Sequence, residues 1–118
     1  MAEISLEFYI DKEIAEAGVC YAAGDAAKAF RHLERAHILA QGDTVQHTRV
    51  HWLMLKHGLR EHDVKEVAGQ VLRIGGAVTK TPFGIYPKGN TGGANVSPIK
   101  PMPIEADLAA ILESADRR

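Results

Sequence analysis

The sequence predicts an all-α protein built from two antiparallel helical hairpins, a long ordered arm rich in glycine and proline, and a short C-terminal helix. Three observations predict this class. Apolar residues recur at three- and four-residue steps through the first two thirds of the chain, single glycines interrupt that region at Gly24, Gly42 and Gly58, and no proline precedes Pro82. Steps of three and four residues mark one face of a helix, whereas a strand alternates every second residue.

The length and composition predict one domain. A chain of 118 residues, 46% hydrophobic and 25% charged, is long enough to bury one ordinary core. We therefore expect a single domain over residues 1–118. Within it we expect a helical body (1–74), an extended arm (75–103) and a terminal helix (104–115).

The charge and cysteine content exclude several classes of function. With 14 basic and 15 acidic residues the chain has no broad basic field for a phosphate backbone, so nucleic acid is not an expected partner. No apolar run approaches the roughly 20 residues that span a bilayer, and no membrane role is expected. The start of the chain does not resemble a secretory signal, and the single Cys20 cannot form an internal disulfide. We expect a cytoplasmic protein.

The first hairpin is predicted from two helices on either side of Gly24. The first helix runs from about Leu6 to Ala23, and Asp25 is a good N-cap for a second helix that reaches about Gln41. The apolar stripe of the first helix comprises Ile10, Ile14, Ala17 and Tyr21. The stripe of the second comprises Ala26, Phe30, Leu33, His37 and Ala40.

The second hairpin begins with a helix that Asp43 or Thr44 caps. This third helix continues through about His57, and Gly58 suits the left-handed position after its end. Its apolar residues point in many directions, which predicts a buried central element. They are Val45, Val50, Trp52, Leu53, Met54 and Leu55.

The fourth helix is predicted to start at Glu61 or Asp63 and to end at Ile74. Two consecutive glycines, Gly75 and Gly76, follow it directly. Glycine is among the poorest residues for a helix interior, so we expect the helix to close there and the arm to begin.

The arm from Gly75 to Pro103 changes in composition to glycine, proline and polar residues, including PFGIYPKGNTGGANVSPIKPMP. No helix is expected among so many helix breakers. Apolar residues remain spaced through the arm, so we expect it to pack over the helices as ordered chain. Those apolar residues are Phe83, Ile85, Tyr86, Val96, Ile99 and Met102. Pro103 opens the last helix, whose Leu108, Ile111 and Leu112 face the body.

The candidate functional site is a group of histidines around the turn between the second and third helices. A helix advances about 100° per residue, so Glu34 and His37 lie one turn apart, as do His47 and His51 on the next helix. The short turn lets His37 and His47 face each other, with Glu34 and His51 one turn deeper. Three imidazoles and a carboxylate suit a divalent transition metal such as zinc, copper, nickel or iron.

His37 is the strongest indication of this site because it lies within an apolar stripe. A buried ring without a partner costs roughly 1–3 kcal/mol. One alternative is a core histidine that donates to a backbone carbonyl or to Glu34. In the metal hypothesis Glu34 is a fourth ligand or orients a ligand, and with an open position it becomes the general base of a metal-dependent enzyme. His32 points away and is excluded from the site.

A glycine-rich block, Asn90-Thr91-Gly92-Gly93, stands in the middle of the arm. It lacks the Gly-Lys-Ser/Thr ending of a phosphate loop. One interpretation is a chain reversal with positive φ angles. The other is a run of backbone amides that binds an anion or covers a site. Both interpretations stay open.

The segment YAAGD at 21–25 and the small residues after it resemble the middle of a tetratricopeptide repeat, in which small residues let two antiparallel helices pack closely. Gly58 lies one 34-residue period after Gly24. The match then fades, because Asp63 and Gln70 stand where a second repeat needs small residues. The resemblance supports helical hairpins but implies no peptide-binding groove.

A wider resemblance covers the chain from about Ala17 to Leu112. The blocks FRHLERAHILAQ, HTRVHWLMLKHGL, GQVLRI and GNTGGANVSPIKPMPI resemble, in order and spacing, a family of small bacterial proteins, domain-of-unknown-function family 3703. This resemblance implies a link to heavy-metal resistance and implies no reaction. Its pattern picks out Glu34, His37, His47, His51 and the Asn90-Thr91-Gly92-Gly93 block.

The function predicted from the sequence is transition-metal binding between the second and third helices. The alternative is a helical adaptor that binds a protein partner, or a second copy as a homodimer, with the histidines serving packing and hydrogen bonds. A metal-dependent enzyme that uses Glu34 as general base is a further alternative.

Overall fold

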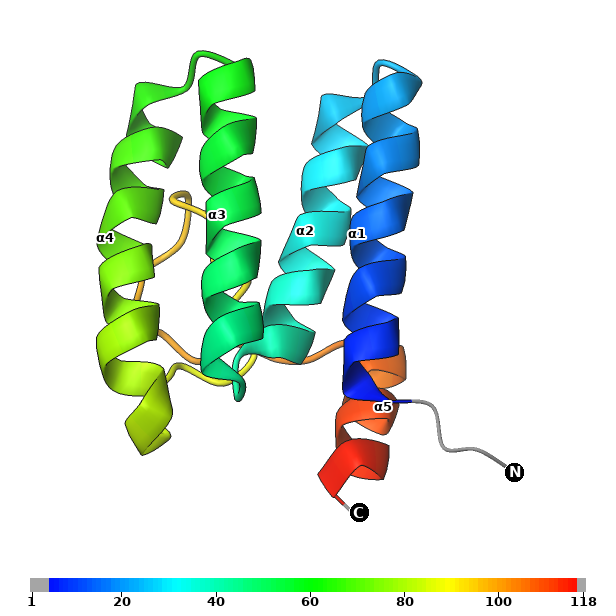
Figure 1. The fold of residues 1–118 in the computed structure, drawn as a ribbon, viewed down its shortest axis with the longest axis vertical. Coiled ribbons are helices and arrows are strands. Elements are labelled where there is room, and N and C mark those ends of the chain that lie inside the picture. The colour runs from blue at the N-terminus through cyan, green and yellow to red at the C-terminus, as the bar shows by residue number, and fades with distance from the viewer. Residues whose placement is uncertain (1–4, 117–118) are drawn as a thin grey trace.

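A computed structural model describes residues 5–116 and confirms the all-α class (Figure 1). The helices are α1 (Leu6–Ala22), α2 (Ala26–Ala40), α3 (Thr44–Arg60), α4 (Val64–Lys80) and α5 (Ala106–Asp116), with a short 3-10 helix η1 (Thr81–Phe83). α1 pairs with α2 and α3 with α4 as two antiparallel hairpins, and α2 contacts α3. Residues 5–116 contain no strand. None of the described helices is long and apolar enough to cross a membrane.

The four long helices begin at polar N-caps, two of which the sequence predicted. Each cap side chain accepts a hydrogen bond from the backbone N–H three residues further on. A cap of this kind stabilises a helix by about 1 kcal/mol and fixes where it starts. The caps are Ser5, Asp25, Asp43 and Asp63.

The second hairpin repeats the first with an offset of 38 residues. Asp25 and Asp63 are equivalent caps, and the residues before them, Gly24 (φ +80°) and His62 (φ +56°), both adopt the left-handed conformation. The 34-residue period and the left-handed role predicted for Gly58 are therefore wrong. Gly58 lies inside α3, where a Cβ would come within 3.1 Å of the α4 backbone, so glycine here permits close helix packing.

The most buried helix is α2, at the centre of the layer. Its small residues Ala29, Ala36 and Ala40 are fully buried, which allows neighbouring helices to approach closely. α3 was predicted to be the buried central element, and this is wrong, because Val45 and Trp52 are exposed by 73% and 54%. α3 buries one face only and presents another apolar face to solvent.

α4 continues through Gly75 and Gly76 to Lys80, so the predicted helix end at Ile74 is wrong. Each helical glycine costs about 1 kcal/mol relative to alanine. Burial of Ala77 on the inner face of α4 offsets part of this cost. The helix stops before Pro82, the second residue of η1. Proline lacks a backbone N–H and its ring clashes with the preceding turn, so it ends an α-helix.

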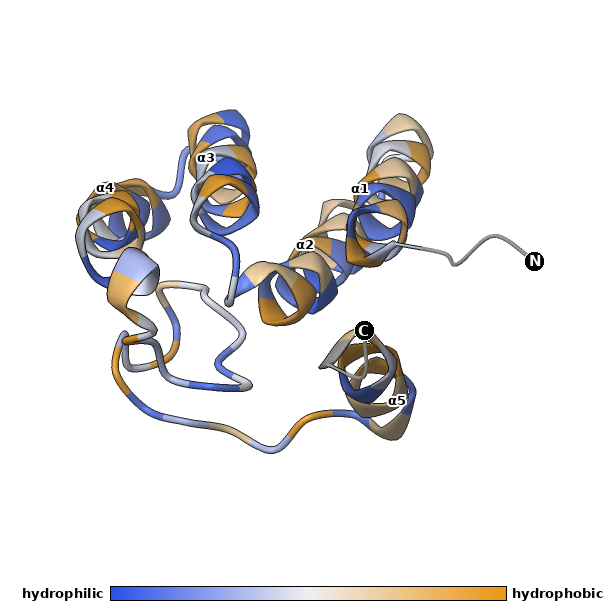
Figure 2. Ribbon diagram, turned by 60° about the horizontal axis from the view of Figure 1, so that its bottom comes forward, coloured by the Kyte–Doolittle hydropathy of each residue, from blue (hydrophilic) through white to orange (hydrophobic). Residues whose placement is uncertain are grey.

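The arm, residues 84–105, and α5 lie together on one side of the four-helix layer (Figure 2). The predicted packing of the arm over the helices is confirmed, but the predicted anchors Phe83, Ile85 and Ile99 are mostly exposed. Polar contacts hold the arm instead. Gln41 at the end of α2 accepts from the Gly89 N–H and donates to a backbone carbonyl of the arm, both at 2.8 Å.

The terminal helix α5, which the sequence predicted to face the helical body, packs against α1 and α2. Leu108 is fully buried in the core. Outside the core, Arg35 of α2 forms ion pairs with Glu13 of α1 at 2.9 Å, with Glu105 at 2.7 Å, and with Asp107. One guanidinium thus joins three segments of the chain at the end of the arm.

Candidate metal site

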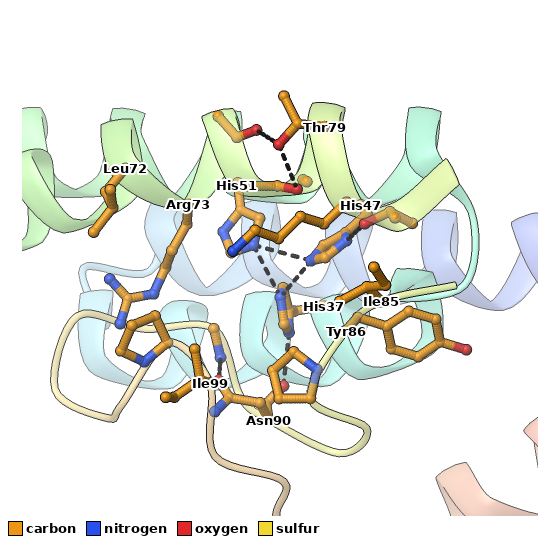
Figure 3. Close-up of a pocket in the computed structure, with 18 of the residues that line it drawn as sticks. His37, His47, His51, Leu72, Arg73, Thr79, Ile85, Tyr86, Asn90 and Ile99 are labelled. Carbon is orange, nitrogen blue, oxygen red and sulfur yellow. Dashed lines mark hydrogen bonds between the residues drawn. The ribbon is translucent and has the colours of Figure 1, made fainter. Parts of the chain in front are cut away.

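Three histidine side chains from two helices converge beneath the arm (Figure 3). His37 of α2 faces His47 and His51 of α3, and their Nε2 atoms lie 3.0, 3.0 and 3.1 Å apart. All three residues are at most 5% exposed. The spacing of four residues places His47 and His51 one turn apart on the same face of α3, and the short turn after α2 sets His37 opposite them.

The tautomers of two rings follow from their partners. The Nδ1 of His37 lies 2.7 Å from the backbone oxygen of Asn90, which can only accept, so this Nδ1 carries a proton. The Nδ1 of His51 lies 2.6 Å from Oε1 of Gln70 and donates to it. A neutral ring protonated at Nδ1 has a lone pair on Nε2. The Nε2 atoms of His37 and His51 therefore direct lone pairs at each other.

The orientation of the Gln70 amide is fixed by its own partners. Its Nε2 donates to the Glu66 carboxylate at 2.6 Å and to the Gly92 carbonyl at 2.8 Å, which leaves Oε1 as the acceptor for His51. Glu66 also accepts from the Ala94 N–H at 3.1 Å. This buried chain of carboxylate, amide and imidazole orients His51, as hydrogen-bond partners orient metal-binding histidines in general.

The tautomer of His47 is not fixed by its hydrogen-bond partner. Its Nδ1 lies 2.8 Å from the buried hydroxyl of Thr81, which can donate or accept. If His47 is protonated on Nε2, a single N–H faces the lone pairs of His37 and His51. If it is protonated on Nδ1, three lone pairs face one another. In neither case do the three rings satisfy one another.

Burial keeps the three rings neutral. Desolvation lowers the pKa of His47 to about 4 and that of His51 to about 3, and it lowers the pKa of His37 well below its ordinary value. After desolvation, the largest cause, the neighbouring rings also contribute to the lowered pKa of His37 and His51. A neutral imidazole is the form that binds a metal ion.

The arm closes over His37 through a left-handed glycine. Gly92 has φ +87°, and a Cβ at this position would lie 2.6 to 2.8 Å from atoms of the His37 ring. The side chain of Asn90 shapes the loop, because it accepts from the Gly92 N–H at 2.9 Å and donates to the carbonyls of Ser97 and Lys100. The glycine-rich block is both a chain reversal and the cover of the histidine cluster.

Among the described residues, the potential metal ligands that the structure brings together are His37, His47 and His51, and Glu34 is not one of them. Its carboxyl is half-buried, and desolvation raises its pKa. The nearby Thr91 hydroxyl partly opposes this shift in pKa, although no hydrogen bond of good geometry forms. His32, which was excluded from the site, pairs with Glu13 at 2.7 Å.

The cluster borders a pocket of about 610 Å³ between α4 and the arm (Figure 3). The three Nε2 atoms could bind one ion with metal–nitrogen bonds of about 2.0–2.1 Å. Their separations would then give nitrogen–metal–nitrogen angles of roughly 95°. Angles this small would place the three nitrogens on one side of the ion and leave the other side free of these ligands. Arg73 and Lys80 are the cationic residues of the pocket lining. Its apolar lining includes Leu72, Ile85, Tyr86 and Ile99.

Three residues that orient the site, Glu66, Gln70 and Thr81, were not predicted from the sequence. Gln70 carried a signal, because on a helix it shares a face with the apolar residues Val67, Ile74 and Ala77. A polar side chain at a packing position needs a buried partner. Thr81 carried no comparable signal, since its position depends on where α4 ends.

The comparisons with known proteins agree with the resemblance noted in the sequence. No curated protein and no solved structure matches the chain. A family model matches residues 5–112, a range that includes all four long helices, the arm and the three histidines. The chain therefore belongs to the family described as protein of unknown function (DUF3703).

Proposed function

We propose that this protein binds one divalent transition-metal ion through the Nε2 atoms of His37, His47 and His51. The observation that carries the proposal is the 3.0 Å approach of Nε2 of His37 to Nε2 of His51, both with lone pairs set by their Nδ1 partners. Opposed lone pairs in a buried site are unfavourable without a cation between them. A metal ion satisfies all three nitrogens at once.

The ligand set favours zinc, copper, nickel or iron over magnesium or calcium. Imidazole nitrogen is a ligand of borderline acceptors, whereas the two lighter cations prefer oxygen ligands. Three neutral ligands leave the charge of the ion uncompensated. This favours an additional anionic ligand, such as hydroxide, on the side that faces the pocket.

The biological role we propose is the handling of heavy-metal ions in the cytoplasm. A buried thiol without a disulfide partner, Cys20, is in keeping with a reducing compartment. A preformed site with an exchangeable position can accept an ion and release it. Among the described residues that line the pocket none is a carboxylate, so the role of Glu34 as a general base gains no support.

The test is the metal content of protein purified without an affinity tag. We expect one ion per chain after incubation with zinc, copper, nickel or iron(II), and loss of that ion in His37→Ala and His51→Ala. His32→Ala is the matched control, because its ring pairs with Glu13 away from the cluster. Wild-type protein that stays unloaded with all four metals would rule the proposal out.

A structural effect of the substitutions is separated from a loss of ligands by circular dichroism. Each variant should keep the helical spectrum of the wild type at room temperature. A variant that is helical but unloaded has lost a ligand, whereas an unfolded variant is replaced by His37→Gln or His51→Gln, which keep more of the side-chain volume.

A further inference from the structure

Two stripes of large apolar side chains lie on the face of α3 and α4 that is turned away from the arm. Within each stripe the residues are seven positions apart, and their exposed fractions run from 51% to 81%. The α3 stripe is Val45, Trp52 and Leu59. The α4 stripe is Val64, Val71 and Val78.

The two stripes border each other. On α3, His57 packs against Phe30 of α2, and Trp52 lies roughly 140° round the helix from His57, toward α4. On α4, Val67 faces α3 at Gly58, and Val64 and Val71 lie one turn either side of Val67. The stripes therefore form one continuous apolar strip along the outer side of the hairpin.

The antiparallel hairpin also sets the two stripes in register. Because the chain reverses at residues 61–63, between α3 and α4, residues equally far before and after this turn lie side by side at the same height along the hairpin. Three pairs of residues therefore lie at matching heights: Leu59 with Val64, Trp52 with Val71, and Val45 with Val78. A seven-residue apolar repeat on two adjacent antiparallel helices is half of the seam of a four-helix bundle.

The strip is large enough for a stable complex. At their exposed fractions the six side chains present on the order of 600 Å², close to the roughly 800 Å² that each partner contributes to a specific interface. Contiguous exposed apolar patches of this size on a soluble domain mark interaction sites.

Two small exposed residues of α4, Ala68 and Gly75, lie within roughly 40–60° of the valine stripe round the helix. No other group lies within 4 Å of a Cβ placed at Gly75. Small residues beside large ones on one surface allow two copies to interlock, as a two-fold interface requires.

We propose that this protein is a homodimer in which α3 and α4 of the two copies form an antiparallel four-helix bundle. The strip and the histidines lie on different faces of α3, since Trp52 is exposed and roughly 140° round the helix from His47, whereas His47 and His51 are buried beneath the arm. The dimer leaves the metal pocket open. The proposal therefore stands independently of metal binding.

The experiment compares the full-length wild type with Val71→Glu by light scattering after size exclusion. We expect the wild type at twice its chain mass of 12.8 kDa and Val71→Glu at the monomer mass. Trp52 is the chain's one tryptophan, so its emission reports the interface directly. It should be blue-shifted in the wild type and red-shifted in Val71→Glu.

Val19→Glu on α1 is the matched control. Val19 is exposed by 65%, against 59% for Val71, and lies away from the strip, so this variant should stay dimeric. Circular dichroism establishes that both variants are folded. A wild type that is monomeric with solvent-exposed Trp52, or a Val19→Glu that dissociates as Val71→Glu does, would overturn the homodimer.

Discussion

The Nδ1 of His51 donates a 2.6 Å hydrogen bond to Oε1 of Gln70, and this contact joins the histidine-bearing face of α3 to α4. Gln70 in turn donates to Glu66 and to the Gly92 carbonyl of the arm. The geometry of the cluster is thus set by residues far from it in sequence. The predictions below address these supporting residues, the protonation of the rings, and the ion.

Gln70→Leu removes the acceptor of the His51 Nδ1 proton and preserves most of the side-chain volume. Loss of such a partner lowers metal affinity about 10–100-fold in other proteins, and we expect a loss in this range. Competition of zinc with a chromophoric chelator measures it. Gln46→Leu on α3 is the control, because Gln46 contacts Arg49 and no histidine. An unchanged zinc affinity in Gln70→Leu would mean that Gln70 does not orient His51.

Gly92→Ala places a methyl group within 2.6 Å of the His37 ring and strains a left-handed backbone. We expect a loss of metal binding, together with destabilisation by the 1–2 kcal/mol typical of a left-handed alanine and about 1–3 kcal/mol more from the clash. Thermal unfolding and zinc titration measure the two effects.

Gly84→Ala separates the clash from the backbone strain. Gly84 has φ +74° and nothing within 4 Å of an added Cβ. It should lose about 1–2 kcal/mol of stability and keep its metal affinity. Equal metal loss in both variants would show that the contact with His37 is unimportant.

The metal-free protein should lose stability as the pH falls below 6.5. Above this pH the rings are neutral in both the folded and the unfolded states. Below it the unfolded chain binds protons, while burial holds the pKa of His47 at about 4 and that of His51 at about 3 in the folded protein. The free energy of unfolding should therefore fall by up to about 1.4 kcal/mol per pH unit for each buried ring.

Urea unfolding between pH 7 and pH 5 measures this slope, in a range where most carboxylates stay ionised. The double variant His47→Gln, His51→Gln is the control, because it keeps only one ring of the cluster. Its stability should depend less steeply on pH than that of the wild type. A wild-type stability that is constant over this range would contradict burial of neutral rings.

Glu34→Gln should leave metal affinity and stoichiometry unchanged, since the carboxyl lies outside the cluster. The same zinc competition assay decides this, with His37→Ala as the positive control for loss. A tenfold or greater loss in Glu34→Gln would restore Glu34 to the site as a ligand or an orienting residue.

The helices were predictable from local signals, and their ends were less so. Asp25 and Asp43 marked helix starts because a cap acts through its own backbone neighbours. The end of α4 depends on packing that offsets two helical glycines, and such packing is not encoded locally. The predicted end of α3 is wrong for the same lack of a local signal. The sequence predicts the left-handed residue at Gly58, whereas in the structure His62 adopts the left-handed conformation.

The histidines were predictable because helical periodicity and one short turn determine where His37, His47 and His51 point. The partners of their Nδ1 atoms come from η1, α4 and the arm. These segments are 34, 19 and 53 positions away from the rings they contact, so the contacts depend on the complete fold. Glu34 shares the helical spacing but faces Thr91 instead of the cluster.

The most direct test of the metal site is the X-ray absorption spectrum of tag-free, zinc-loaded protein. We predict three imidazole nitrogens at about 2.0–2.1 Å from one zinc ion per chain, completed by a light exogenous ligand. His51→Ala, treated in the same way, should retain no zinc and so give no protein-bound zinc spectrum. A wild-type spectrum with one imidazole or none, or with a protein thiolate, would contradict binding by His37, His47 and His51.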